Sequence, residues 1–399
     1  MNRPRHLPPS PRQHFSASTP AIRSRYLASV DLQRGGQLDE AEVGYRWVLA
    51  RVPAHFDAMH LLGVVRAQRE DYEEALQWLV NAVRIHDQSA AAFHNLANAQ
   101  HALKRFDEAL ASADRALELN PEHVRAWRSR GHVLRDMRRT EEALASYDRA
   151  LAIEPGYVDA LIDRADQLRQ MKRDDEAVTA YRQARDAGAD PQAMAYALAS
   201  LGAEAPPPAA PSAYVAGLFD QYARSFDTHL VDTLKYQTPA LLMALVAPLL
   251  PSRPLDVLDM GCGTGLCGPL LKPHAHTLTG IDLSPKMLDQ ARQRDLYDAL
   301  VCDELVHWLD TQPARFDLAV AADVFVYIGD LDAVFRAVRA ALLPGGLFAF
   351  SCEASDEDDV LLRATLRYAH SASYLRRLAG AHGFEVEAMQ QGVIRQDEG

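Results

Sequence analysis

Small and acidic residues recur at a fixed interval through the first half of the chain. Ala41, Ala75, Ala109, Ala143 and Ala177 are 34 residues apart; two acids precede each of them, and a small or branched apolar residue follows seven positions later. Such a pattern predicts pairs of antiparallel helices, because small residues let two helix backbones approach closely and acids stabilise the start of a helix. One pair cannot bury its apolar face alone, so we expect about five pairs to stack into an α solenoid over residues 21–204.

The second half alternates between short apolar runs and amphipathic stretches. The runs at 255–260, 277–282, 299–302, 316–322, 347–351 and 384–389 predict six strands. Helical patterns separate them, and one begins at Ser284 and Pro285, an N-cap residue followed by a first-turn proline. The alternation predicts an α/β Rossmann-like, doubly wound sheet after the solenoid.

Two segments interrupt these patterns. Residues 205–212 are rich in proline and predict a semi-rigid linker, so we expect a second domain over 213–399, while a helix near 192–201 covers the end of the solenoid. Residues 1–20 contain prolines and arginines but no apolar core, which predicts a disordered tail rather than a secretory signal.

Composition narrows the class of protein. Of the 399 residues, 48% are hydrophobic and 24% charged, as in globular proteins, and no apolar run is long enough to predict a membrane span. The four cysteines form no CxxC pair, so we expect no disulfide scaffold, no metal site and a reducing, cytoplasmic environment. Residues 205–399 hold 15 basic and 25 acidic residues, a balance that argues against a nucleic-acid partner.

A glycine-rich turn, GCGTG at 261–265, follows the first predicted strand of the second half. A turn whose backbone contacts a ligand has no room for side chains, and the helix after it directs amide donors at that ligand. Asp282, at the end of the next predicted strand, can then accept hydrogen bonds from two ribose hydroxyls. These features predict a site for a nucleoside whose other end is polar and anionic.

Two cofactors fit this turn. Residues 263–268 satisfy the dinucleotide pattern GxGxxG, with Asp282 about 20 residues further on. Read from Asp259 to Gly265, the same turn is DxGxGxG, whose acid would repel a pyrophosphate but could accept a hydrogen bond from an ammonium. We therefore favour S-adenosyl-L-methionine and keep an NAD-linked oxidoreductase as the less favoured alternative.

Both halves resemble known families. The repeats resemble the tetratricopeptide family, and most of residues 214–395 resembles the class I S-adenosylmethionine-dependent methyltransferases. The motifs that carry the second resemblance, in order, are VLDMGCGTG, GIDLSPKML, CDEL, FDLAVAADVFVYIGDL and LLPGGLFAFS. The lead-in at 214–239 resembles that of bacterial methyltransferases with tetratricopeptide repeats. Members of the methyltransferase family usually end with a seventh, antiparallel strand beside the fifth. Here residues 391–395 supply a shortened version of that strand, or the sheet edge is uncovered.

The resemblance implies a role for each matching residue. Asp259 would surround the methionine portion together with three glycines, and Asp282 would hold the ribose. The glycines are Gly261, Gly263 and Gly265. The residues implied near the adenine and the sulfonium are Leu283, Met287, Asp303, Glu304, Ala322 and Asp323. Tyr222 and Phe226 would close over the cofactor or pack in the core of a lead-in helix.

The expected function is methyl transfer to an unidentified protein or small-molecule acceptor. Weak candidates for a general base are Asp323, Tyr327 and His307, because a base is needed only where the acceptor carries a proton. The tetratricopeptide resemblance implies that the repeat groove binds a protein or peptide; bracing or dimerisation is the alternative. A repeat-based adaptor with an inactive, cofactor-binding methyltransferase domain also remains open.

Overall fold

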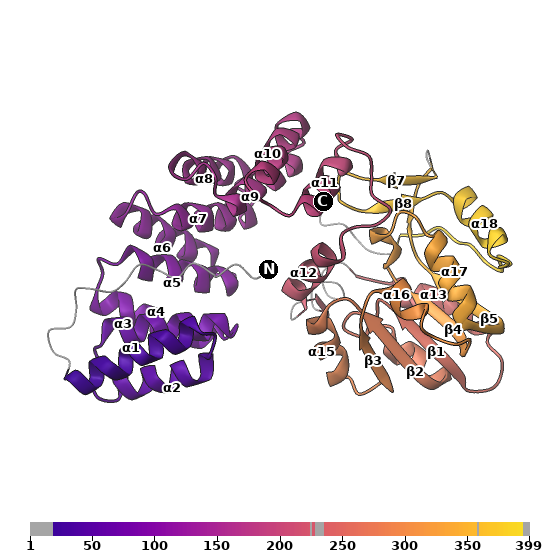
Figure 1. Ribbon diagram of the computed structural model, residues 1–399, viewed down its shortest axis with the longest axis horizontal. Helices are drawn as coiled ribbons and strands as arrows, with labels where there is room; N and C mark the ends of the chain where they lie inside the picture. Colours follow the sequence, from indigo (N-terminus) through magenta and orange to yellow (C-terminus); the bar gives the residue numbers. More distant parts are fainter. Residues whose placement is uncertain (1–18, 224–225, 228–234, 357–358, 394–399) are drawn as a thin grey trace. The chain divides into compact units, whose positions relative to one another are not determined.

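The computed structural model describes residues 19–223, 226–227, 235–356 and 359–393. The chain divides into two compact units, Met1–Ala189 and Asp190–Gly399 (Figure 1). Most of the tail expected at 1–20 lies outside the described residues.

The first unit consists of paired helices. They are α1 (Pro20–Arg34), α2 (Leu38–Leu49), α3 (Phe56–Gln68), α4 (Tyr72–Ile85), α5 (Ala90–Ala102), α6 (Phe106–Leu119), α7 (Val124–Asp136), α8 (Thr140–Ile153), α9 (Val158–Gln170) and α10 (Asp174–Asp186). Each pair packs on the next in chain order, as a solenoid requires.

The repeated alanines lie where the sequence pattern expects close packing. All five are fully buried in the second helix of a pair, and the apolar residues seven positions later are fully buried too. The acids before each alanine lie in the first turn of these helices. A Cβ at Gly131 would meet the ring of Tyr147 at 2.3 Å, so the backbone of α7 packs directly on this ring of α8. The predicted solenoid is confirmed.

A parallel sheet forms the centre of the second unit. Its strands are β1 (Leu255–Met260), β2 (Ala275–Asp282), β3 (Ala299–Cys302), β4 (Phe316–Ala321) and β5 (Leu342–Phe350), in the spatial order β3-β2-β1-β4-β5. The helices around it are α11 (Pro191–Ser200), α12 (Ser212–Tyr222), α13 (Thr238–Val246), α14 (Gly268–Leu271), α15 (Pro285–Gln293), α16 (Leu305–Leu309), α17 (Asp332–Ala341) and α18 (Ala372–Ala381). Short 3₁₀ helices occupy Ala247–Leu249, Lys272–His274 and Phe325–Tyr327.

Side chains of β1 pack on both faces of this sheet. Leu258 and Met260 belong to a core with side chains of α16, α17 and α18, whereas Leu255 and Val257 pack with α13 and α14. Both faces are therefore covered, which explains why the strands read as continuous apolar runs. None of the described helices has the length and apolar character needed to cross a membrane.

The end of the second unit differs from the expected strands. Residues 384–389 are irregular rather than a sixth strand, and 391–393 form no strand either, while the rest of the 391–395 candidate lies outside the described residues. A second sheet was not anticipated: β6 (Glu353–Ala354), β8 (Tyr368–His370) and β7 (Val360–Leu362) pair in that order. These strands are two or three residues long, too short for an alternating pattern to be recognised.

The proline-rich segment is part of the second unit rather than a spacer. The carbonyl of Pro208 accepts hydrogen bonds from the amides of Gly329 and Asp330, each 2.8 Å long. The amide of Ala210 donates a 2.8 Å hydrogen bond to the carbonyl of Tyr327. Helix α11 also belongs here, since the Tyr196 hydroxyl donates to the carbonyl of Leu366 at 2.6 Å. The division at 189–190 thus precedes the boundary expected at 205–212. Prolines lack an amide donor but keep their carbonyls as acceptors, which composition alone does not reveal.

Candidate cofactor and acceptor site

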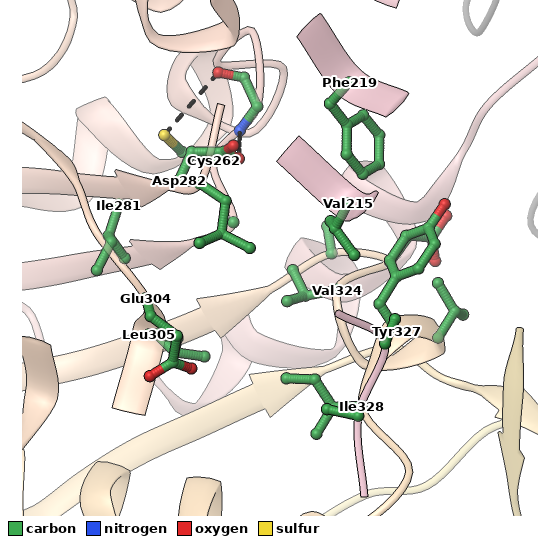
Figure 2. A pocket seen from close by; sticks show the side chains of 18 of the residues that line it. Val215, Phe219, Cys262, Ile281, Asp282, Glu304, Leu305, Val324, Tyr327 and Ile328 are labelled. Atoms are coloured by element: carbon green, nitrogen blue, oxygen red, sulfur yellow. Dashed lines mark hydrogen bonds between the residues drawn. The ribbon is translucent and has the colours of Figure 1, made fainter. Parts of the chain in front are cut away.

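A cavity of about 380 Å³ lies at the carboxyl ends of β1, β2 and β4. This edge is where open parallel sheets bind ligands. In Figure 2 the side chains of Asp282 and Glu304 lie on one side of the cavity, and the rings of Phe219 and Tyr327 lie on the other.

The three glycines after β1 have positive φ angles of 62°, 54° and 86°, which side chains rarely adopt. At Gly261 a Cβ would also meet Cγ2 of Val324 at 2.4 Å. Gly265 is similarly crowded by Tyr297, at 3.0 Å. Gly263 differs, because its nearest neighbour in that direction is the ring of Phe226 at 4.0 Å. The first and third glycines permit close packing, and the middle one leaves its backbone open to the cavity.

Asp282 ends β2 and lines the cavity. Its two carboxylate oxygens accept 2.8 Å hydrogen bonds from the amides of Gly263 and Ser284. Burial raises the pKa of this carboxyl, while these amide donors act in the opposite direction. Each carboxylate oxygen can accept more than one hydrogen bond, so Asp282 keeps capacity for a ligand's hydroxyls.

The helix before the sheet forms one wall. Val215 and Phe219 of α12 line the cavity, and Phe219 makes edge contacts with the rings of Phe226 and Tyr327. Asp220 fixes this helix, because the hydroxyl of Ser284 donates to its carboxylate at 2.6 Å. This hydrogen bond therefore connects α12, which forms the wall, to the N-cap residue of α15.

The end of β4 forms another wall. Asp323 has a φ of 58°, unusual for a residue with a side chain, and its carboxylate accepts a 2.7 Å hydrogen bond from Ser351. Burial raises the pKa of the Asp323 carboxyl, whereas hydrogen bonds from Ser351 and Tyr236 and the charge of Arg367 act to lower it. The surroundings of Asp323 therefore hold it in one orientation at the cavity.

Nine of the residues expected at the site line this cavity. They are Gly261, Gly263, Asp282, Leu283, Asp303, Glu304, Ala322, Asp323 and Tyr327. Phe226, expected to close over the cofactor, lines it too. The structure thus places these residues around one cavity, and their contacts with a cofactor stay a prediction.

Five expected residues do not line the cavity. Asp259 is buried behind the turn and accepts a hydrogen bond from Tyr297, and Gly265 packs against the same ring. Met287 is fully buried on the inner side of α15, and Tyr222 lies outside the cavity with 48% of its surface exposed. The side chain of His307 is largely exposed and contacts Asp303 at 3.0 Å. Sequence position alone cannot tell on which side of a turn or helix such residues point.

Some lining residues were missed. Val215 and Phe219 are four positions apart on one helix face, a spacing that could have indicated them together with Phe226. Tyr236 and Arg367 carried no such signal, because tertiary contacts alone bring them to the cavity.

Comparisons with known proteins agree with both halves of this description. Residues 258–348 match the methyltransferase domain family, and residues 26–90, 94–158 and 130–193 match tetratricopeptide repeats. These matches confirm the methyltransferase domain and the repeats expected from the sequence, and they agree with S-adenosylmethionine as the cofactor of that domain.

Curated relatives share only part of their length with this chain. A malonyl-[acyl-carrier protein] O-methyltransferase from Pseudescherichia vulneris is 33% identical over 141 residues, which are 35% of this chain and 54% of that protein. An 18S rRNA (guanine-N(7))-methyltransferase from Bos taurus is 33% identical over 101 residues, 25% of this chain and 34% of that protein. The chain thus spans about a third to a half of these relatives, whose names give different acceptors.

A solved structure is similar to part of the chain. TTC0263, a thermophilic TPR protein in Thermus thermophilus, is 22% identical, and the match covers 45% of this chain and 98% of that one, with a TM-score of 0.39.

Proposed function

We propose, from the premise that this chain carries a methyltransferase domain and tetratricopeptide repeats, that it is a class I enzyme transferring a methyl group from S-adenosyl-L-methionine to an acceptor in the same cavity. The repeats would bind a protein or peptide partner. The observation that carries the proposal is the continuity of the cavity, which reaches from Asp282 to Ala322 and Asp323 at the end of β4.

The residues around the cavity suit the cofactor. Gly263 leaves the turn open, and Asp282 retains acceptor capacity for ribose hydroxyls. Asp303 and Glu304 line the same end, where they could accept from an adenine amino group. The cavity volume lies within the range of roughly 300–1,000 Å³ typical of small-molecule sites.

When bound, the cofactor supplies a methyl group on a sulfonium, which a nucleophile displaces in line. The protein's main task is then to orient the acceptor and exclude water. The rings of Phe219 and Phe226, which contact each other at the wall of the cavity, would exclude water from the bound cofactor. The end of β4 would face the acceptor.

Asp323 is the best placed residue to take a proton from an acceptor. It lines the cavity, and burial raises the pKa of its carboxyl, which makes the carboxylate a stronger base. The pKa of Tyr327 is also raised by burial, which keeps its hydroxyl protonated. His307 lies outside the cavity. We therefore assign the base role to Asp323 for acceptors that must lose a proton.

Ligand binding distinguishes the cofactors. S-adenosylhomocysteine should raise the unfolding temperature of the second unit, and NAD should not, because only a ligand that binds the native state stabilises it. A shift with NAD alone would favour the oxidoreductase.

Turnover distinguishes the enzyme from the adaptor. Purified protein incubated with S-adenosylmethionine labelled in its methyl group and a cell lysate should label one fraction of protein, lipid or small molecules. Asp323→Asn should still bind S-adenosylhomocysteine but transfer little label. Cofactor binding without transfer by the unaltered chain would support the adaptor.

A further inference from the structure

The cavity has an uneven distribution of charge. Among the described residues that line it, Arg367 is the one lysine or arginine, and most of the remaining walls are apolar. The lining carboxylates are Asp282, Asp303, Glu304, Asp323 and Asp330. Among these lining residues Arg367 is therefore the one positive charge that an anionic group entering the cavity could pair with.

The backbone around Arg367 is held from several directions. Arg367 is the last residue of the turn that connects β7 to β8. Its carbonyl accepts a 2.9 Å hydrogen bond from the amide of Arg363, the first residue of that turn. The carbonyl of the preceding Leu366 accepts from the Tyr196 hydroxyl at 2.6 Å, and the following Tyr368 is fully buried. These contacts fix the backbone from which the side chain of Arg367 extends to the cavity.

The described residues do not neutralise this guanidinium fully. The charge of Arg367 lowers the pKa of Asp323 and of Tyr327 against the effect of burial, so both side chains lie near the guanidinium. No carboxylate of the described residues forms an ion pair with it, and Arg367 is half-buried. Donors of the guanidinium remain for a ligand, and bidentate binding of a carboxylate matches their planar arrangement.

Arg367 belongs to the acceptor end of the cavity. Arg367 directly precedes β8, which packs against the 3₁₀ helix that contains Tyr327, and the ring of the adjacent Tyr368 lies against Gly329. Ile328 and Tyr327 provide an adjoining wall, which Figure 2 shows across the cavity from Glu304. The space beside Arg367 thus combines one cation with apolar surface.

We propose that the methyl acceptor carries a carboxylate next to an apolar group, and that Arg367 binds this carboxylate. This inference rests on the proposed methyltransferase function. Arg367 would then determine specificity, because an uncharged analogue would leave the guanidinium without a counter-charge.

A pair of simple probes tests this assignment. Benzoate and benzamide have the same size and apolar ring but differ in charge, and calorimetry can measure their binding to the full chain saturated with S-adenosylhomocysteine. We expect benzoate to bind about tenfold more tightly than benzamide. Arg367→Met should abolish this preference, and Arg367→Lys should retain part of it.

Arg363→Met is the matched control. Arg363 lies on the same turn but outside the cavity, where it pairs with Glu353 at 2.8 Å. This variant should keep the preference, and all variants should keep their affinity for S-adenosylhomocysteine within about threefold.

Three results overturn the proposal. They are equal or absent binding of the two probes by the unaltered chain, a preference that survives in Arg367→Met, and a preference that Arg363→Met also removes. A loss of S-adenosylhomocysteine affinity of about tenfold or more in Arg367→Met would instead assign the guanidinium to the cofactor's carboxylate. Failure of the unaltered chain to bind S-adenosylhomocysteine would refute the proposed function itself.

Discussion

The hydroxyl of Tyr297 donates a 2.6 Å hydrogen bond to the carboxylate of Asp259, beneath the glycine-rich turn. Asp259 is buried, and burial raises its pKa to about 7, although the hydrogen bond from Tyr297 acts to lower it. The carboxyl is thus a buried support of the turn, and it faces Tyr297 rather than the cavity.

This environment predicts a specific pH dependence of stability. Because the pKa of Asp259 is higher in the folded than in the unfolded chain, the folded state retains a proton between about pH 4 and pH 7. The stability that this proton contributes to the folded state is fully present below about pH 4. It is lost progressively as the pH rises, and the loss is complete just above pH 7. Asp259→Asn should remove this loss, so its stability relative to the unaltered chain should increase by on the order of 3 kcal/mol from pH 5 to pH 8.

Thermal unfolding at several pH values measures the effect, using the transition that S-adenosylhomocysteine shifts. Comparison of the two proteins cancels the titration of the histidines common to both. A constant difference between them from pH 5 to pH 8 would show that Asp259 does not titrate in this range.

Asp282 should dominate cofactor affinity. Asp282→Asn replaces one carboxylate oxygen by an amide nitrogen, which cannot accept from Gly263 or Ser284 or from a ribose hydroxyl. Hydrogen bonds to charged groups contribute roughly 1.5–3 kcal/mol each, so affinity for S-adenosylhomocysteine should fall by about 100-fold or more. Titration calorimetry measures this change. Asp256→Asn, at the opposite end of β1, should bind normally, and an equal loss there would point to general damage.

Local patterns predicted most of the fold because each pattern depends on a few neighbouring residues. The interval between the alanines marked the helix pairs, and all five alanines are buried as expected. Ser284 indeed caps α15, accepting from the amide of Met287 at 3.1 Å. The short strands β6 to β8 and the hydrogen bonds of Pro208 depend on contacts between distant parts of the chain. No local pattern carries that information.

The same distinction applies to the site. Residues at the ends of strands, such as Gly261, Asp282 and Asp323, were predicted because parallel strands end at a common edge. Asp259 and Met287 occupy similar motif positions, but tertiary packing turns them into the protein interior. Motif position therefore identified the edge of the sheet but not the direction of every side chain.

Two glycines of the turn should respond differently to alanine. At Gly261 the added Cβ would meet Val324 at 2.4 Å in a backbone conformation with φ of 62°, so Gly261→Ala should destabilise the second unit by about 2–3 kcal/mol. At Gly263 nothing closer than Phe226 at 4.0 Å obstructs the Cβ, so only the backbone penalty of about 1 kcal/mol applies.

Measurements of cofactor affinity distinguish a loss of cavity space from the effect of backbone strain. Gly263→Ala should remain folded but bind S-adenosylhomocysteine at least about tenfold more weakly, because its methyl group would occupy the cavity. Unfolding curves and titration calorimetry on both variants measure the two effects. Equal stabilities, or unchanged affinity in Gly263→Ala, would contradict the assignment of the open glycine to the ligand.

The turn within each helix pair offers a way to stabilise the repeats. Gly36, Glu70, Lys104, Arg138 and Lys172 are 34 positions apart, and all have positive φ angles between 57° and 79°. The first repeat uses glycine, for which this conformation is free of strain, while the others use residues with a Cβ. Lys104 is exposed. Lys104→Gly should therefore relieve strain, partly offset by the greater freedom of glycine in the unfolded chain, for a net gain of about 0.5–1 kcal/mol.

Gly36→Ala is the reciprocal variant, since its Cβ would meet no atom within 4 Å and only the backbone changes. It should lower stability by about 1 kcal/mol. Thermal unfolding of the repeat unit, the transition that S-adenosylhomocysteine leaves in place, should move by about 2–4 °C per kcal/mol, upward for Lys104→Gly and downward for Gly36→Ala. A decrease for both would mean that the Lys104 side chain stabilises its turn by more than the strain costs.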